Sequence, residues 1–332
     1  MKIFVFEMIT GGGFSAEPLR PSLAHEGDRM LRSLLRDLSD LPEVRVTTSR
    51  DPRLPPVPDV AAIMPAPGEE PWALYARGAR GADAAWPIAP ETDGLLERLT
   101  RQTLALDKCL LGSRPEAVRL AASKWQTARV LDAGGLPAVP TFAAGERLPP
   151  LAGPWVVKPD DGAGCEGVQL VPDWRAAGER LAAGSGRLIA QPWIDGCALS
   201  LSLLCCDGRA ALLCCNRQHV RLVDGRPTLD AITVNALPDA EGLLAGLATR
   251  IAAAIPGLWG YVGVDLVLAP DGPVVLEINP RLTTSYCGLR SALGMNAAAL
   301  VLDLLTTPDA GRCQTPTGTA TATVSLVGHH AD

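Results

Sequence analysis

Positive charge and long apolar runs are both scarce in this chain of 332 residues. Its 30 lysines and arginines are outnumbered by 36 aspartates and glutamates, which gives a formal net charge of -6. Nucleic-acid binding depends on basic surfaces, and no basic stretch here is interleaved with aromatic residues, so no nucleic-acid partner is expected. No uninterrupted apolar segment reaches membrane-spanning length, and Glu7 breaks the N-terminal apolar stretch too early for a signal peptide. We therefore expect a cytoplasmic protein with no membrane partner.

No C-x-x-C pair is present, although the chain has nine cysteines. Nine cysteines in a chain of this length do not make a disulfide scaffold. The adjacent pairs Cys205-Cys206 and Cys214-Cys215 flank a turn and are expected to face each other on a hairpin. Neighbouring residues in a strand point to opposite faces, which disfavours a metal site. The cysteines are therefore interpreted as small buried hydrophobic residues in a reducing compartment.

Strand and helix patterns alternate over residues 1–112. An apolar strand over residues 3–9 precedes a helix whose apolar residues recur at helical spacing, namely Leu31, Leu34, Leu35 and Leu38. This alternation predicts a small Rossmann-like α/β domain. The triplet Gly11-Gly12-Gly13 follows the first strand, at the place where open α/β sheets bind ligands. A tight turn and a substrate loop are equally favoured interpretations of it.

A mixed α+β pattern begins at residue 113 and predicts two further domains, over residues 113–190 and 191–332. A helical stretch from Pro115 runs through Lys124 and ends at Gly134-Gly135, which are typical of a helix end. Strands around a glycine-rich loop complete the first of these domains. The second is mainly antiparallel strand, and the tail from Arg312 could add an edge strand.

Oxygen-bearing side chains interrupt two apolar strands in the last of these domains. Glu277 and Asn279 are two residues apart and so point to the same face of one strand, while Asp265 interrupts the strand before it. If the turn between the strands is the three residues 270–272, Asp265 lies directly opposite Glu277. Carboxylate and amide oxygens suit magnesium, which keeps several waters and shares phosphate oxygens with the protein. A structural polar cluster is the better interpretation of any one acid alone, but not of three such residues in register.

A second apolar strand ends at Lys158 and is followed by a loop that contains Gly162, Gly164 and Gly167. Glycine lets backbone N–H groups approach an anion because no Cβ intervenes. A lysine beside such a loop supplies a compact positive charge for phosphate, and Lys124 on the preceding helix would be a second. A lone lysine is usually a solvated surface charge, so Lys158, at the mouth of an apolar strand, is the stronger candidate.

The order of these motifs resembles that of the ATP-grasp carboxylate–amine ligases. The resemblance covers residues 113 to about 305 and rests on Lys124, Lys158 with its glycine loop, Gln191-Pro192-Trp193-Ile194-Asp195-Gly196, Asp265, and Glu277-Ile278-Asn279-Pro280-Arg281. It implies an ATP-grasp fold, in which two α+β lobes grip ATP, preceded by the Rossmann-like α/β domain.

The resemblance also implies roles for single residues. Lys124 and Lys158 would hold the phosphates of ATP, and the loop with Gly162, Gly164 and Gly167 would close over them. The strip against adenine would be Gln191, Pro192, Trp193 and Ile194. Two magnesium ions, or manganese in their place, would bind Asp265, Glu277 and Asn279.

Two positions depart from the family pattern. Many members bind the ribose hydroxyls with a glutamate where this chain has Ala198, and Gln191 replaces the acid that begins the adenine strip. Asp195 and Ser200 are the alternatives for the ribose. The choice between ATP and GTP is left open by these departures.

Three segments are most similar to the branch of the family that joins glutamate to tyramine in methanofuran biosynthesis, within one-carbon metabolism. They are residues 6–13, 88–92 and 279–286. The implied activity is an ADP-forming C–N ligase, in which a carboxylate is phosphorylated and an amine then displaces the phosphate. Its partners would be small molecules, an amino acid such as glutamate and an amine such as tyramine. Arg281 and Arg217 would steady the acyl phosphate or a free carboxylate.

Two alternatives to this activity stay open. One is a ligase for another acid and amine, and the other is a regulator that binds nucleotide without catalysis, which the absence of the ribose glutamate permits. The intact metal-ligand set argues against the regulator. His219 is a weaker candidate for accepting a proton from the amine, because a lone histidine is more often structural. The sequence does not determine the oligomeric state, and a homodimer is one of the possibilities.

Overall fold

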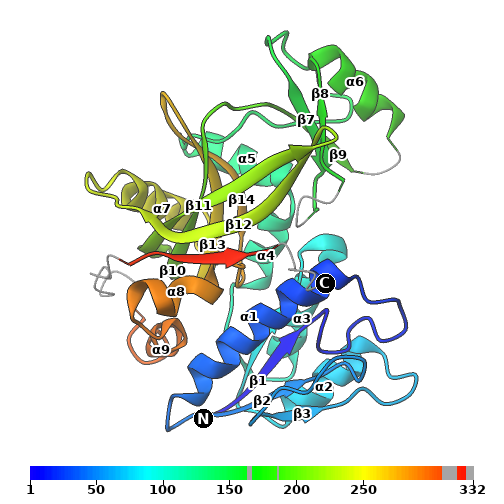
Figure 1. Cartoon of the computed structure of the whole chain (residues 1–332), viewed down its shortest axis with the longest axis vertical. Coiled ribbons are helices and arrows are strands. Elements are labelled where there is room, and N and C mark those ends of the chain that lie inside the picture. The colour runs from blue at the N-terminus through cyan, green and yellow to red at the C-terminus, as the bar shows by residue number, and fades with distance from the viewer. Residues whose placement is uncertain (163–166, 185–186, 309–319, 327–332) are drawn as a thin grey trace, which may run out of the picture.

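Three β-sheets organise the chain within the described residues (Figure 1). The computed structural model describes residues 1–162, 167–184, 187–308 and 320–326. The first sheet has five parallel strands, the second four antiparallel strands and the third six antiparallel strands. A parallel α/β unit followed by antiparallel α+β units confirms the predicted fold class.

The first sheet has the strand order β3-β2-β1-β4-β5. Its elements are β1 (Lys2–Glu7), α1 (Pro21–Ser39), β2 (Arg45–Ser49), β3 (Ala61–Ile63), α2 (Pro71–Arg80), β4 (Ala84–Ile88), the 3-10 turn η1 (Thr92–Gly94), α3 (Leu95–Ala105) and β5 (Cys109–Leu110). Ile3 and Val5 of β1 pack in the core that contains α1, whereas Phe4 and Phe6 pack with residues of α2 and α3. Helices cover both faces, which is why β1 reads as a continuous apolar run.

The order of the first sheet reverses between β1 and β4, because the chain moves outward from β1 to β3 and then returns to the other side of β1. Open α/β sheets bind ligands beyond the carboxyl ends of the strands at such a switch point. Glu7 ends β1, and Glu91 follows β4. The first sheet therefore offers acidic residues at this edge.

The glycine triplet after β1 forms a tight turn. The N–H of Gly11 donates to the carbonyl of Glu7 at 2.7 Å, and the N–H of Gly13 donates to the carbonyl of Met8 at 3.0 Å. A Cβ at Gly11 would lie 2.5 Å from the oxygen of Glu7, so any side chain there would clash with backbone. Glycine is needed here for the turn itself.

The second sheet has the order β6-β9-β7-β8 and forms, with α6, the lobe at the top of Figure 1. Its segment contains α4 (Pro115–Ala122), α5 (Lys124–Ala133), β6 (Phe142–Ala143), β7 (Trp155–Pro159), β8 (Gln169–Val171), α6 (Trp174–Ala183) and β9 (Leu188–Pro192). The expected single helix from residue 115 to 134 is wrong, since Ser123 is extended (φ -94°, ψ 109°) and separates two helices. Its Oγ accepts from the N–H of Gln126 at 3.1 Å and so caps α5. Lys124 therefore begins a helix.

The third sheet has the order β14-β13-β10-β11-β12-β15. Its segment contains β10 (Cys197–Cys206), β11 (Arg209–Val223), β12 (Arg226–Leu237), α7 (Leu243–Ala254), β13 (Gly260–Ala269), β14 (Gly272–Asn279), α8 (Tyr286–Leu293), α9 (Ala297–Asp303) and β15 (Ala322–Ser325). The tail does add an edge strand, because β15 pairs with β12.

The adjacent cysteine pairs lie on the β10–β11 hairpin, but they do not face each other. Cys205 is opposite Ala210, and Cys214 is opposite Ser202, so the expected facing arrangement is wrong. All four cysteines are buried, and the cysteines among the described residues are free thiols. Their interpretation as small buried hydrophobic residues fits this environment.

The three units touch one another around one central region. Helix α1 packs on α8 and α9 (Figure 1), and the hydroxyl of Tyr286 donates to Asp37 at 3.0 Å. The β11–β12 hairpin spans from the third sheet to the second, where the N–H of Leu170 donates to the carbonyl of Gly225 at 3.1 Å. The expected boundary at 190/191 falls inside β9, and the division into three domains stays a proposal. No helix among the described residues combines the length and hydrophobicity of a transmembrane span.

Candidate functional site

A cavity of about 600 Å³ lies where the three units meet. This volume is typical of a small-molecule site. Its walls include the predicted site residues Lys124, Lys158, Gly162, Gln191, Pro192, Trp193, Ile194, Arg217, Asp265, Glu277, Asn279 and Arg281. Gly167 is described and is not part of the wall, and Gly164 lies outside the described residues. The Gly11-Gly12-Gly13 turn does not line the cavity either, which favours the turn interpretation of that triplet.

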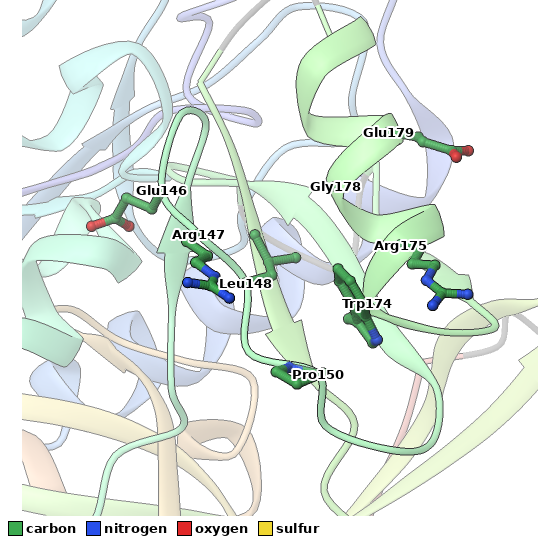
Figure 2. A pocket seen from close by; sticks show the side chains of 8 residues that line it. All are labelled: Glu146, Arg147, Leu148, Pro150, Trp174, Arg175, Gly178 and Glu179. Carbon is green, nitrogen blue, oxygen red and sulfur yellow. The ribbon is translucent and has the colours of Figure 1, made fainter.

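A second hollow, of about 460 Å³, lies beside α6 and contains none of the predicted site residues (Figure 2). Glu146 and Glu179 point away from each other there, and Trp174 and Leu148 form its apolar part (Figure 2). Charged groups do not converge on a common point, so the central cavity is the better candidate site.

The oxygen-bearing side chains of β13 and β14 lie in register. Asp265 pairs with Glu277, as expected, but the turn between the strands is shorter than expected. Ala269 pairs with Gly272, which leaves a two-residue loop, and a β-bulge between Asp265 and Leu266 shifts the register by one residue. The turn is one residue shorter than expected and the bulge adds one residue to β14, so Asp265 still lies opposite Glu277.

Hydrogen bonds hold these oxygens in place. Asn279 Nδ2 donates to Asp265 Oδ2 at 3.1 Å, and Gln218 Nε2 donates to Asp265 Oδ1 at 2.9 Å. Burial and the neighbouring carboxylate of Glu277 raise the pKa of Asp265. Two carboxylates thus share one site with an amide. Residues 216–219 are a further similarity to the ligase branch, but Gln218 was not among the predicted site residues.

Both predicted lysines converge on Glu277. Lys124 Nζ lies 3.4 Å from Glu277 Oε2 and donates to the carbonyl of Gly162 at 2.5 Å. Lys158 Nζ lies 4.0 Å from the same Oε2. Burial acts to raise the pKa of Glu277, but the two lysines outweigh it and lower that pKa. The second and third sheets therefore bring their charged residues to one point.

The donor set fits a divalent cation that is shared with phosphate. Among the described residues no group of three or more histidine, cysteine, aspartate or glutamate side chains is placed to hold a metal ion, and the site offers two carboxylates and one amide. Magnesium is typically bound by one or two carboxylates together with phosphate oxygens and waters. A cation between Asp265 and Glu277 would also relieve the repulsion that raises the pKa of Asp265. The metal-ligand roles stay a prediction that this chemistry supports.

The predicted adenine strip leaves β9 along the cavity wall. Gln191 is buried, and its Nε2 donates to Thr141 Oγ1 at 3.0 Å. The N–H of Trp193 donates to the carbonyl of Pro154 at 2.9 Å. Of the two alternatives for a ribose, Ser200 lines the cavity, whereas Asp195 accepts from Trp193 Nε1 at 2.8 Å and is not part of the wall.

Arg281 lies in the wall and is held by a residue that the sequence did not single out. Its Nε lies 2.9 Å from Glu91 Oε1, and its Nη2 donates to Glu91 Oε2 at 3.0 Å. The two side chains are 13% and 7% exposed. Burial alone would lower the pKa of Arg281, but Glu91 and, after it, Glu26 and Glu277 raise that pKa. The sequence placed Glu91 within residues 88–92, one of the segments that carry the family resemblance, but gave it no role of its own.

The other two candidates differ in their surroundings. Arg217 is exposed on β11 and lines the cavity. His219 is exposed on the same strand, bonds to Thr233 Oγ1 at 2.8 Å and does not line the cavity, which favours the structural interpretation. Glu26 and the hydroxyl residues Thr283, Thr284 and Ser285 complete the wall near Arg281.

Comparisons with known families match most of the chain. The model of an ATP-grasp domain matches residues 121–285, and that of a pre ATP-grasp 3 domain matches residues 44–118. Over 210 residues, 63% of this chain, the sequence is 30% identical to tyramine–L-glutamate ligase of Methanocaldococcus jannaschii. It is 31% identical over 206 residues to phosphoribosylamine–glycine ligase of Caulobacter vibrioides. The matches cover 59% and 48% of those two relatives.

Solved structures share the architecture over nearly the whole chain. An ATP-grasp superfamily protein from Archaeoglobus fulgidus superposes with a TM-score of 0.76 at 25% identity, covering 98% of this chain and 92% of that one. L-amino acid ligase from Bacillus licheniformis gives a TM-score of 0.67 at 17% identity and covers 97% and 78%. At that lower identity the similarity concerns the fold alone.

Proposed function

The chain belongs to the ATP-grasp family, and from this premise we propose that it is an ATP-dependent ligase that joins a carboxylate to an amine, with glutamate and tyramine as its substrates. The observation that carries the proposal is the convergence of Lys124 and Lys158 on Glu277, beside Asp265 and Asn279. Such a group of cations and hard oxygen ligands suits a nucleoside triphosphate with its metal. The 30% identity to a tyramine–L-glutamate ligase supports the choice of substrates.

The reaction has two displacement steps. A carboxylate oxygen attacks the γ-phosphorus of ATP, the bond to the bridging oxygen breaks, and ADP leaves with the electron pair. The neutral amine then attacks the acyl carbon, phosphate leaves with the electrons of the C–O bond, and the nitrogen releases a proton. Magnesium, when bound, would supply positive charge that offsets the negative charge of the phosphates.

The residues of the chain would contribute by position and charge. Asp265, Glu277 and Asn279 would hold the metal, and Lys124 and Lys158 would face the phosphates. Catalysis of phosphoryl transfer depends mainly on positioning and electrostatic stabilisation, and it requires no covalent intermediate on the protein. Arg281, fixed by Glu91, and the exposed Arg217 would steady the anionic groups of the acid substrate.

The apolar part of the cavity suits an aromatic amine. Val220 and Leu222 on the β11–β12 hairpin are 39% and 52% exposed and line the cavity together with Pro227 and Leu229. Exposed apolar side chains that gather at a cavity are typical of a binding surface. The ring of tyramine would cover such a surface.

Replacing Glu277 with glutamine tests the ligase activity. The Glu277→Gln variant would lose a metal-binding charge, and we expect ADP release with glutamate and tyramine to fall about hundredfold or more. Asp271→Asn is the matched control, because Asp271 is exposed in the turn between the same two strands. The assay measures ADP by coupled enzymes and the amide by mass spectrometry, and circular dichroism checks that both variants are folded.

The outcome also separates the alternatives. Turnover by Glu277→Gln equal to that of the control would contradict the metal site. Amide formation with other acids and amines, but not with glutamate and tyramine, would assign a different substrate pair. ATP binding without ADP release across the whole panel would indicate a regulator.

A further inference from the structure

We propose that Glu26 binds the ammonium group of the amino-acid substrate and thereby makes the site select amino acids over acids that lack this group. The inference rests on the proposed ligase function and identifies a residue that determines specificity. Glu26 belongs to α1 in the first unit, whereas the predicted ATP-binding residues come from the second and third units. It therefore lies on a wall of the cavity that the nucleotide residues do not form.

Glu26 faces the cavity as an acid with no lysine or arginine partner among the residues that the structure describes. It lines the cavity, is half-buried and accepts a hydrogen bond from Thr284 Oγ1. No lysine or arginine nitrogen in the described part of the chain lies within ion-pair distance of its carboxylate. A partly desolvated carboxylate gains from a charge-assisted hydrogen bond, and an ammonium group supplies one.

Arg281, a cation in the same cavity wall, is already engaged. Arg281 lies close enough for the charge of Glu26 to act on it, but its guanidinium is paired with Glu91, to which its Nη2 donates. Glu26 and Arg281 are therefore separate charges of opposite sign in one wall. An amino acid carries the same two signs on its α-carbon, and this complementarity favours it over a simple dicarboxylic acid.

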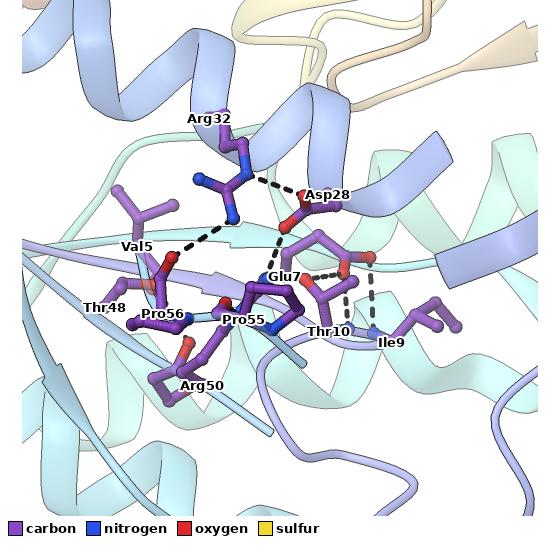
Figure 3. A network of polar contacts seen from close by, with 11 residues as sticks. Val5, Glu7, Ile9, Thr10, Asp28, Arg32, Thr48, Arg50, Pro55 and Pro56 are labelled. Carbon is purple, nitrogen blue, oxygen red and sulfur yellow. Dashed lines mark hydrogen bonds and ion pairs between the residues drawn. The ribbon is translucent and has the colours of Figure 1, made fainter. Parts of the chain in front are cut away.

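Helix α1 is fixed against the first sheet directly beside Glu26. A Cβ at Gly27 would lie 2.6 Å from Glu7 Oε2, so the absence of a side chain lets α1 approach the buried Glu7. Glu7 accepts from the N–H and the Oγ1 of Thr10, both at 2.6 Å (Figure 3). At the next residue of α1, Asp28 pairs with Arg50 at 2.5 Å (Figure 3). The part of α1 that directly follows Glu26 is thus fixed by two contacts, at the switch point of the sheet.

The ammonium in question is that of the acid substrate and not that of the attacking amine. An amine must be neutral to attack an acyl carbon, and an ion pair with Glu26 would stabilise its charged, unreactive form. The α-ammonium of an amino acid takes no part in the reaction and can stay charged throughout. A carboxylate in the wall therefore suits this spectator group.

The experiment compares glutamate with glutarate, which lacks the amino group. The ratio of kcat/KM for glutamate to that for glutarate is measured for the wild type and for Glu26→Gln, with magnesium, ATP and tyramine present. We expect the ratio to fall about ten- to hundredfold in Glu26→Gln, mainly through the KM for glutamate, because a hydrogen bond to a charged group is lost. Glu241→Gln, at an exposed carboxylate outside the cavity, should keep the wild-type ratio. An equal loss with both acids would overturn the inference, since it would indicate a structural role or an action on the amine.

Calorimetric binding separates this inference from the proposed function. Glutamate and glutarate are titrated into each protein with magnesium and ADP, so turnover is not needed. A wild-type preference for glutamate that Glu26→Gln loses supports the ammonium site even if no ADP is ever released, in which case only the ligase proposal fails. Wild-type protein that binds glutamate no better than glutarate would refute the role of Glu26.

Discussion

Replacing Glu91 with glutamine removes the negative half of the pair that joins the first unit to the cavity wall. Glu91 and Arg281 are 7% and 13% exposed, and two contacts of 2.9 and 3.0 Å connect them. Without its partner, the guanidinium of Arg281 would be left as a buried charge. Removing one partner of a buried pair typically costs about 3 to 5 kcal/mol of the free energy of unfolding, and we expect Glu91→Gln to lie in this range.

An exposed pair on the same unit provides the contrast. Arg101 and Glu97 lie one helical turn apart on α3, and their side chains are 52% and 21% exposed. Water screens and solvates both groups, so Glu97→Gln should leave the free energy of unfolding within experimental error. The two variants make the same chemical change at a buried and at an exposed pair, and Arg101 also keeps its contact of 3.3 Å with Glu116.

Urea unfolding followed by tryptophan fluorescence and by circular dichroism measures the effect. Urea is preferred to guanidinium chloride because a salt would screen the charges under test. Coincidence of the two signals checks that the units unfold together. The double variant Glu91→Gln/Arg281→Met removes both charges and should recover part of the loss, because an apolar replacement leaves no buried charge.

The reasoning is refuted if Glu91→Gln costs less than about 1 kcal/mol, the upper value typical of exposed pairs. It is also refuted if the double variant is as unstable as the sum of the two single variants. Either result would mean that Arg281 reaches water or another acid when Glu91 is neutral.

Three further predictions concern other parts of the molecule. Burial raises the pKa of Glu7 above its usual 4.5, so its protonated form stabilises the fold fully below pH 4.5, and this stability is lost as the pH rises through the raised pKa. Between about pH 5 and pH 8 the urea midpoint should therefore fall less in Glu7→Gln than in the wild type, and parallel pH profiles would contradict this. Burial raises the pKa of Cys215 to about 12, so this thiol should react slowly with iodoacetamide at about pH 8. The half-buried Cys197 should be modified much faster than Cys215, and equal labelling of the two by mass spectrometry would contradict the assigned burial. A Cβ at Gly78 would lie 2.2 Å from Phe4 Cζ, so Gly78→Ala should lower the free energy of unfolding in urea by about 1 to 3 kcal/mol. An unchanged midpoint of urea unfolding would show instead that α2 moves away from Phe4 without cost.

Local signals predicted most of the elements, because they depend on neighbouring residues. The spacing of leucines between residues 31 and 38 predicted α1, and the apolar run with its Pro-Asp-Gly turn predicted β13 and β14. The break at Ser123 was missed, although a serine before a helix is a recognised cap. Contacts between distant segments could not be predicted. Nothing in the sequence selects Glu91 among 36 acids as the partner of Arg281, 190 positions later, because the packing of the first unit on the third decides it.

The bulge in β14 explains why Glu277 reaches the cavity at all. Val275 packs in the core behind the third sheet, and strict alternation would point Glu277, two residues on, to the same buried side. The bulge leaves Leu276 as an extra residue, and both Leu276 and Glu277 line the cavity while Ile278 returns to the core. A three-residue turn without a bulge would give the same pairing of Asp265 with Glu277, so the register alone does not distinguish the two arrangements. The two arrangements differ in the face to which Leu276 points. Only the bulged strand brings Leu276 to the cavity face, directly beside Glu277, the proposed metal ligand.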